Sequence, residues 1–472
     1  MSRLPIPTAV AVALLIAANG ARANDARAIA LGGSNIADGH GVPGALANPA
    51  ALMAMGRRGE RLHFRFGLSG ELRDDAQLID IATDEANETL ASDTEDAIAA
   101  IDASRVGCLD VNAIDQTVCV SGLAPVARLT ERALDVLDRI DGESVTARLG
   151  GDAGFAVTAG TTPFALHVQA RVIGRARVDV ADADRAYLNG FTSTLADGVL
   201  TLGEIRDTAQ FTLDEVNQRL EVRQPEDALV SSSQGGGVAR LILGASLART
   251  VNIGGRAVDV GLTPKFSAYV TRGIEARVGD EFDENNPTLQ RQLENSEVTG
   301  TSFTVDIGAS VALEERPLRL AAVVRHALPE SIETGDGVEF HTTPQLVVGG
   351  AWRREGSSLT VSADLALNEA EIDGFPTQVL ALGAELVRGP LALRGGINHD
   401  AARAVSPTAL SLGLGLGPFD LGVRVSSVEN IQAGVQLSLG FGGPSGAVVV
   451  PREETPAAPE APSPDEERPK GG

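Results

Sequence analysis

Residues 431–441 have the sequence I-Q-A-G-V-Q-L-S-L-G-F, in which every odd-numbered residue is apolar and every even-numbered residue is Gln, Gly or Ser. Successive side chains of an extended chain point to opposite faces, so this alternation predicts a β-strand with one apolar and one polar face. A barrel that crosses a membrane needs such strands, because its outer face meets lipid and its inner face meets water. The segment therefore favours a transmembrane β-barrel.

The same alternation recurs through the rest of the chain. It is clearest in residues 62–68, 303–311, 359–367, 380–386, 410–416 and 419–425. Short turns separate several of these segments, which is typical of antiparallel neighbours in a meander. The predicted fold class is all-β with helical loop insertions, as a transmembrane antiparallel meander β-barrel of about 14 strands over residues 57–441.

Residues 1–23 predict an export signal. Arg3 precedes an uncharged apolar stretch, and Ala21 and Ala23 are the small residues that a signal peptidase recognises, which predicts cleavage before Asn24. The apolar stretch is shorter than the roughly 20 residues that a membrane-spanning helix needs. The chain is therefore predicted to be exported, and to enter a membrane only as a barrel.

Composition limits the partners of the chain. It has 472 residues and a formal net charge of -24, which argues against nucleic acid or anionic lipid as an electrostatic partner. Aromatic residues make up only 3%, too few for the dense aromatic girdle of a typical outer-membrane barrel. A soluble periplasmic β-rich protein that binds a partner is therefore kept as an alternative.

Three segments lack the strand alternation. Residues 75–142 show a helical period instead, with Val126 and Leu129 on one face, and are predicted to form amphipathic helices within a long loop. Residues 181–237 are polar, with runs of Gly and Ser, and are predicted to form a second long loop. Residues 442–472 are rich in Pro and Glu and are predicted to be disordered.

Cys108 and Cys119 are the only cysteines of the chain. In an oxidising compartment two cysteines this close in sequence favour a structural disulfide. A redox pair would favour the spacing C-x-x-C, which is absent. The sequence therefore predicts a disulfide that closes a small loop.

One long strand is predicted over residues 164–180. Its apolar residues share one parity and a polar set shares the other. Because the apolar face is expected to meet lipid, the polar set is expected to face the lumen. The candidate lumen residues are His167, Gln169, Arg171, Arg175 and Arg177.

The histidines give no sign of catalysis or metal binding. They are His40, His63, His167, His326, His341 and His399. No spacing among them places two on one face as metal ligands, and none lies in a recognisable catalytic motif. We therefore predict no metal site, no catalytic residues and no cofactor.

The stretch that follows the export signal is rich in Gly and small residues. Its motif-like residues are Gly32, Gly33, Asn48, Pro49 and Ala50. This opening resembles that of the FadL-like superfamily of long-chain fatty acid transporters, which are outer-membrane barrels. The acidic helical stretch before the second strand is, within that superfamily, similar to that of TraF-type conjugal transfer proteins. The resemblance implies a plug over residues 24–56 that closes the lumen from the periplasmic side.

Three functions follow from these observations. The first is passive transport of a small hydrophobic solute through a barrel in the outer membrane, with outer-membrane lipid around the barrel and a mostly apolar pocket near Asn48. The second is a structural or assembly role in conjugative transfer, with conjugation proteins as partners, as the family resemblance implies. The third is the soluble partner-binding protein noted above.

Overall fold

The computed structural model describes most of the chain between residues 25 and 441. The described residues are 25–74, 78, 90–103, 118–159, 162–196, 198–207, 210–214, 219–222, 230–277, 292, 295–313, 316–335, 339–354, 356–403, 407–427 and 430–441. The predicted export signal, the predicted C-terminal tail and Cys108 lie outside these residues.

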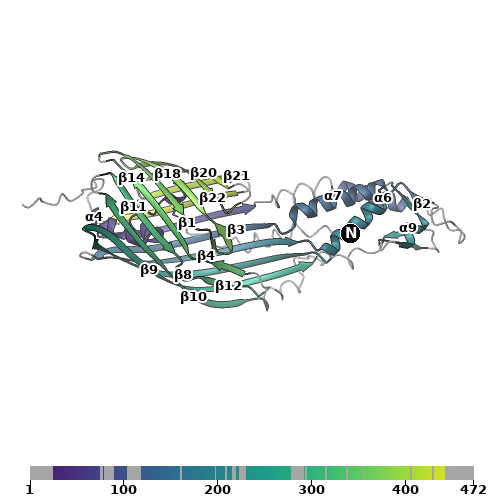
Figure 1. The fold of residues 1–472 in the computed structure, drawn as a ribbon, viewed down its shortest axis with the longest axis horizontal. Coiled ribbons are helices and arrows are strands. Elements are labelled where there is room, and N and C mark those ends of the chain that lie inside the picture. The colour runs from purple at the N-terminus through teal and green to yellow at the C-terminus, as the bar shows by residue number, and fades with distance from the viewer. Residues whose placement is uncertain are drawn as a thin grey trace, which may run out of the picture.

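Fourteen strands form a closed antiparallel barrel (Figure 1). They are β1 (Leu62–Asp74), β3 (Ser144–Ala159), β4 (Thr162–Asp179), β8 (Ser232–Ile253), β9 (Arg256–Arg277), β10 (Val298–Leu313), β11 (Leu318–Arg325), β14 (Gln345–Trp352), β15 (Leu359–Ala366), β18 (Val379–Arg388), β19 (Leu391–Asp400), β20 (Thr408–Leu416), β21 (Phe419–Ser427) and β22 (Asn430–Phe441). Each pairs with its neighbours in chain order, and β22 closes the barrel by pairing with β1. The predicted meander of about 14 strands is confirmed.

The outer face of the barrel is apolar. On β20, Leu412 is 72% exposed and Leu410 and Leu414 are also exposed, whereas the intervening Ser411 is 3% exposed. Large exposed hydrophobic side chains recur on the other barrel strands, including Phe266 of β9 and many leucines. A continuous apolar outer surface is unfavourable in water and matches lipid, so the fold is that of a transmembrane barrel.

The two ends of the barrel differ. At the short-turn end, only residues 389–390 separate β18 from β19 and only residues 417–418 separate β20 from β21. At the long-loop end, residues 75–143 separate β1 from β3, and residues 180–231 separate β4 from β8. Because β1 begins and β22 ends at the short-turn end, both ends of the barrel sequence lie there.

Residues 25–57, which we call the plug segment, lie inside the barrel. They form α2 (Ala26–Ala30), α3 (Gly41–Ala47), the 3-10 helix η1 (Pro49–Leu52) and α4 (Met53–Arg57). Ile29, Leu52 and Met55 are all at most 2% exposed. Helix α2 contacts β19 to β22, and η1 contacts β8 to β10 on the other side of the barrel. The plug segment therefore crosses the lumen.

The two longest connections form an extension beyond the long-loop end (Figure 1). Its elements are α6 (Leu90–Ala103), β2 (Val118–Ser121), α7 (Ala124–Ile140), α8 (Asp182–Thr194), β5 (Val199–Thr201), α9 (Leu202–Asp207), β6 (Phe211–Asp214) and β7 (Arg219–Val222). In the described part of the chain, no helix is both long enough and apolar enough to cross a membrane.

The extension has its own hydrophobic core, and this corrects the predicted polar loop at residues 181–237. Tyr187 and Phe191 are spaced four residues apart, so they lie on one face of α8, and Leu195 follows at the same spacing as the C-cap residue. The Phe191 ring packs edge-on against Tyr187 at 5.2 Å and against Phe211 at 5.1 Å between ring centroids. The many polar residues of this segment hide that apolar face, and the last of them, from Ser232 onward, already belong to β8.

Cys119 lies in this core and is 4% exposed. It belongs to β2, which pairs with β5 from the other long connection. Since Cys108 lies outside the described residues, the bond between the two cysteines stays a prediction.

Two hairpins from the long-loop end fold into the lumen. They are β12 (Glu330–Glu333) with β13 (Glu339–Thr342), and β16 (Ala370–Ile372) with β17 (Phe375–Thr377). Ile332 and Phe340 pack against Ile173 on the inner face of β4. Arg240 of β8 donates a hydrogen bond of 2.8 Å to Glu330. The lumen is therefore narrowed from both ends, by the plug segment at one and by these inner hairpins at the other.

Candidate functional site

A cavity of about 310 Å³ lies inside the barrel between the plug segment and the inner hairpins. Ala28, Ile29 and Leu46 line it from the plug segment, and Phe375 lines it from β17. Its wall is rich in charge. The charged side chains that line the cavity are Asp25, Arg65, Glu71, Arg73, Arg148, Arg171, Lys265, Asp306, Arg325, Asp364, Asp400, Arg403 and Arg424.

Three arginines surround the ring of Phe375. The guanidinium carbon of Arg148 lies 4.2 Å from the ring centroid, that of Arg175 lies at 5.1 Å and that of Arg73 at 5.5 Å. Cations at these distances are attracted to the face of an aromatic ring. We call these four residues the Phe375 cluster. It joins strands β1, β3 and β4 to the inner hairpin, and therefore no local sequence motif marks it.

The structure distributes the candidate lumen residues over four environments. His167 and Gln169 are buried inside the barrel, at 4% and 3% exposure. Arg171 lines the cavity and donates a hydrogen bond of 2.9 Å to Gln169. Arg175 belongs to the Phe375 cluster. Arg177 lies apart from the cavity, exposed near the long-loop end, and pairs with Asp179 of the same strand at 2.9 Å.

The cavity differs from the expected mostly apolar pocket near Asn48. Asn48 is fully buried and does not line the cavity. Its side-chain nitrogen donates to the carbonyl oxygens of Ile36 at 3.2 Å and of Ala309 at 3.3 Å. Its side-chain oxygen accepts from the backbone nitrogen of Ala50 at 3.0 Å, and Pro49 occupies the first position of η1. Asn48 thus fixes the plug segment to β10 and has no contact with the cavity.

Gly32 and Gly33 end helix α2 with positive φ angles of 69° and 103°. Left-handed backbone of this kind is unfavourable for residues with a side chain. Gly32 also approaches the wall closely, because a Cβ atom built on it would lie 2.8 Å from the carbonyl oxygen of Ile397 in β19. The motif therefore turns the chain where the plug segment meets the wall.

Glycines on the barrel wall meet the plug segment in the same way. A Cβ atom at Gly396 would lie 2.4 Å from the carbonyl carbon of Leu31, and one at Gly422 would lie 2.1 Å from the carbonyl oxygen of Ala26. Both distances are far below van der Waals contact. The wall glycines in such contact are Gly154, Gly261, Gly308, Gly349, Gly383, Gly396, Gly413, Gly422 and Gly434. Only the absence of side chains at these positions lets the plug segment fit.

Buried charges add to this contact. Arg27 of α2 is bound to Glu385 of β18 through two hydrogen bonds of 3.0 and 2.8 Å, and it also pairs with Asp38. Glu385 accepts a further bond of 2.6 Å from Arg394 of β19. Arg394 in turn pairs with Asp420 of β21 at 2.6 Å. The network joins the plug segment to three wall strands.

Two other wall carboxylates hold the rest of the plug segment. Asp364 of β15 accepts hydrogen bonds from the backbone nitrogens of Asn35 at 2.7 Å and Ile36 at 3.1 Å. Asp259 of β9 pairs with Arg57 of α4 at 2.5 Å. The plug segment is thus anchored near its start, middle and end.

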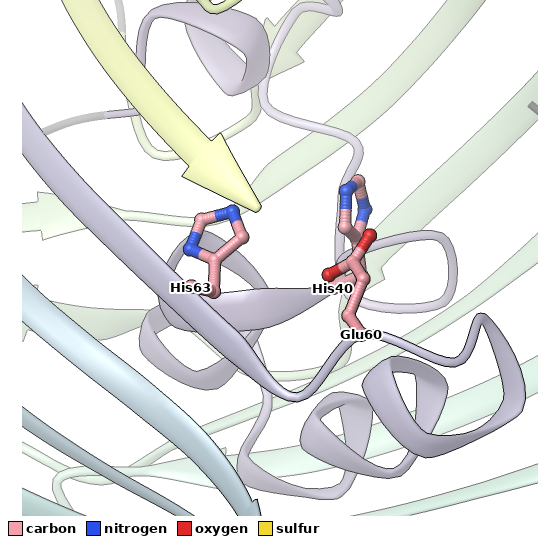
Figure 2. A group of neighbouring side chains, drawn as sticks. All are labelled: His40, Glu60 and His63. Atoms are coloured by element: carbon pink, nitrogen blue, oxygen red, sulfur yellow. The ribbon is translucent and has the colours of Figure 1, made fainter. Parts of the chain in front are cut away.

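A second group of polar side chains lies at the short-turn end. His40 of the plug segment, Glu60 and His63 of β1 come together there (Figure 2). The 23-residue separation of the two histidines gave no signal in the sequence, because the contact forms only when the plug segment folds back against β1. Burial, and then the positive charge of Arg58, hold the pKa of His40 well below its usual range. Burial raises the pKa of Glu60.

The fold and its interior define the class of protein: a transmembrane 14-stranded barrel whose lumen is occupied by an N-terminal segment. The family model described as "F plasmid transfer operon, TraF, protein" matches residues 45–365, which is more than half of the chain. The chain therefore belongs to the TraF family, as the resemblance of its opening and its acidic helical stretch predicted. No curated protein matches the chain.

Several solved structures are similar to the chain over most of its length. One is the deltaS2 mutant of the TodX monoaromatic hydrocarbon channel, with 11% identity, coverage of 88% of this chain and 97% of that chain, and a TM-score of 0.44. A second is the toluene transporter TodX of Pseudomonas putida, with 10% identity, coverage of 88% and 96%, and a TM-score of 0.39. A third is the CymD monoaromatic hydrocarbon channel, with 11% identity, coverage of 88% and 97%, and a TM-score of 0.34.

The close contact between wall and plug segment can be tested with two adjacent glycines of β19. Gly396→Ala places a methyl group against the backbone of Leu31, and we expect it to lower the free energy of unfolding by about 1–3 kcal/mol. Gly395→Ala is the matched control, since the nearest atom to its added Cβ is 3.9 Å away. We expect a change within about 0.5 kcal/mol there. Urea unfolding in detergent measures both values, and equal losses would contradict the contact.

Proposed function

We propose that the chain is a passive channel of the cell outer membrane for a small hydrophobic solute that carries a polar or negatively charged group. The observation that carries this proposal is the cavity enclosed by the wall, the plug segment and the inner hairpins, with the Phe375 cluster on its boundary. A transmembrane barrel with a cavity in its lumen gives such a solute a route across the membrane that the lipid does not. Such a role needs no catalytic group from the chain.

The two ends of the barrel suggest its orientation. Outer-membrane barrels have short turns on the periplasmic side and longer loops on the outside of the cell. The short-turn end, which also holds the start of β1 and the end of β22, then faces the periplasm. The extension faces the exterior, and lipid surrounds the apolar outer face.

The chemistry of the cavity suggests the solute class. Ile29, Leu46 and Phe375 supply apolar contact, while Arg148 and Arg171 supply positive charge. Guanidinium groups bind carboxylates through charge-assisted hydrogen bonds, and an aromatic ring beside them adds apolar contact. A small aromatic or aliphatic carboxylate satisfies both kinds of group.

Passage of a solute requires the plug segment to change position. The buried pair Arg27–Glu385 and the glycine contacts hold it against the wall. Loss of one partner of a buried ion pair costs about 3–5 kcal/mol. The proposed channel is therefore closed at rest, with the plug segment held against the wall. To open it, a new contact has to replace the ion pair and the glycine contacts.

Benzoate tests the proposed solute class. In proteoliposomes at pH 8, where benzoate is charged, we expect uptake above that of empty vesicles. Arg148→Met removes the guanidinium nearest Phe375, and we expect uptake to fall roughly tenfold, equivalent to about 1.5 kcal/mol for a bond to a charged group. Arg177→Met, in the neighbouring strand β4, is the matched control, because Arg177 pairs with Asp179 away from the cavity.

Three outcomes decide the benzoate test. A selective loss in the Arg148→Met variant supports the channel and its solute class. Uptake no faster than in empty vesicles contradicts the channel, and equal uptake by both variants contradicts the role of the Phe375 cluster. A heat-shift gel on each variant verifies that the barrel is folded before uptake is measured.

A second candidate is a structural role in conjugative transfer. Two observations favour it: the family model carries the description of a plasmid transfer protein, and the extension has a core independent of the barrel. A folded extension on the outside of the cell is suited to contact another macromolecule. In this role conjugation proteins are the partners.

Removal of the extension separates the two candidates. Residues 79–141 and 183–229 are each replaced by a short Gly-Ser turn, which leaves the barrel strands intact. We expect benzoate uptake to persist if the barrel is a channel. A fall in plasmid transfer frequency at an unchanged level of folded barrel supports the structural role, and an unchanged frequency contradicts it.

A further inference from the structure

Three side chains at the short-turn end form a compact group of metal-ligating atoms. His40 precedes α3 in the plug segment, Glu60 lies in the turn before β1, and His63 is the second residue of β1. One ligand atom from each lies within 4.8 Å of the others. Figure 2 shows the carboxylate of Glu60 directed toward the ring of His40, with His63 beside them on the strand.

Two buried polar atoms of this group have no hydrogen-bond partner among the described residues. They are Nδ1 of His63 and Oε2 of Glu60. The His63 side chain is almost completely enclosed, at 4% exposure. A buried polar atom without a partner costs about 1–3 kcal/mol, so these atoms are unfavourable unless something else binds them.

The backbone holds the ring of His63 in place. Gly41 has a positive φ of 61°, and a Cβ atom built on it would lie 2.7 Å from the His63 ring. The ring therefore packs directly on the glycine backbone. It meets the ring of His40 edge-on, with 6.1 Å between the centroids. Both imidazoles are thus oriented before any ligand binds.

Charged side chains of both signs surround the group. Arg58 and Arg27 are the cations that act on His40, and Glu60 and Asp38 act on Arg58. Arg27 is itself paired with Asp38 and Glu385, so carboxylates oppose both arginines.

We propose that His40, Glu60 and His63 form a site for a divalent transition-metal ion of the zinc class. Two imidazoles and one carboxylate are a ligand set that zinc accepts, with its fourth position open to water. Calcium and magnesium prefer sets made only of oxygen. Because His40 belongs to the plug segment and His63 to the wall, the ion joins the two directly.

We expect a bound metal ion to stabilise the plug segment in its position against the wall. A bound ion adds a bridge between His40 and β1, at the opposite end of the lumen from the Phe375 cluster. A ligand that binds only the folded state raises the unfolding temperature, and a tighter ligand raises it more. The inference concerns binding alone, so it stands or falls separately from the proposed solute channel.

Calorimetric titration with ZnCl₂ tests the site. The full mature chain, folded in detergent, without a polyhistidine tag and freed of metal with EDTA, is expected to bind one Zn²⁺ per chain and to unfold at a higher temperature with zinc. Loss of a residue that only hydrogen-bonds to a metal ligand weakens metal binding roughly 10–100-fold. We expect His63→Ala and Glu60→Gln, which each remove a ligand, to weaken Zn²⁺ binding by more than that. His399→Ala, at an exposed histidine, is the matched control and should bind as the parent does.

The outcomes of this titration are distinct. Binding that is lost in the two site variants and kept in the control supports the site. Absence of binding up to millimolar zinc, or equal binding by all variants, overturns it. Glu60→Gln preserves the shape of the side chain, so it keeps the test valid if His63→Ala fails to give a heat-shifted, folded barrel.

Discussion

The close approach of two backbones, that of the plug segment and that of the barrel wall, is the constraint on which the rest of the structure depends. At Gly396, Gly413 and Gly422 a side chain would overlap the plug segment. Protein interiors are packed too tightly to absorb such an overlap without strain. The cavity lies where the plug segment does not fill the lumen. The group of His40, Glu60 and His63 forms because the same segment folds back against β1.

The charged side chains that line the lumen differ from what the net charge of the whole chain suggests. The chain is strongly acidic, with a formal net charge of -24, yet arginines dominate the cations that line the cavity. Inside the barrel these cations are paired or stacked, as with Arg27 on Glu385 and Arg148 on Phe375. Breaking such a buried pair is more costly than any single surface contact. Buried charge therefore holds the plug segment against the wall.

Sequence patterns predicted the wall well because lipid outside and polar groups inside impose a period of two on every strand. Residues 431–441 belong to β22 with that alternation intact. Helix α8 was missed because the apolar residues that face the core, Tyr187 and Phe191, are sparse among polar ones. The Phe375 cluster and the pairing of His40 with His63 join segments far apart in the chain. No spacing rule finds such contacts without the fold.

Disulfide cross-linking of the plug segment to the wall tests the central claim most directly. A Cβ atom at Gly33 would lie 3.9 Å from that of Ala381, which is within the range for a disulfide. In isolated outer membranes, mild oxidation of the Gly33→Cys/Ala381→Cys variant should give the cross-linked peptide pair by mass spectrometry. Ala384 lies on the outer face of the same strand, so Gly33→Cys/Ala384→Cys should give none. Equal cross-linking of both pairs, or none in the first, would contradict a plug segment seated in the lumen.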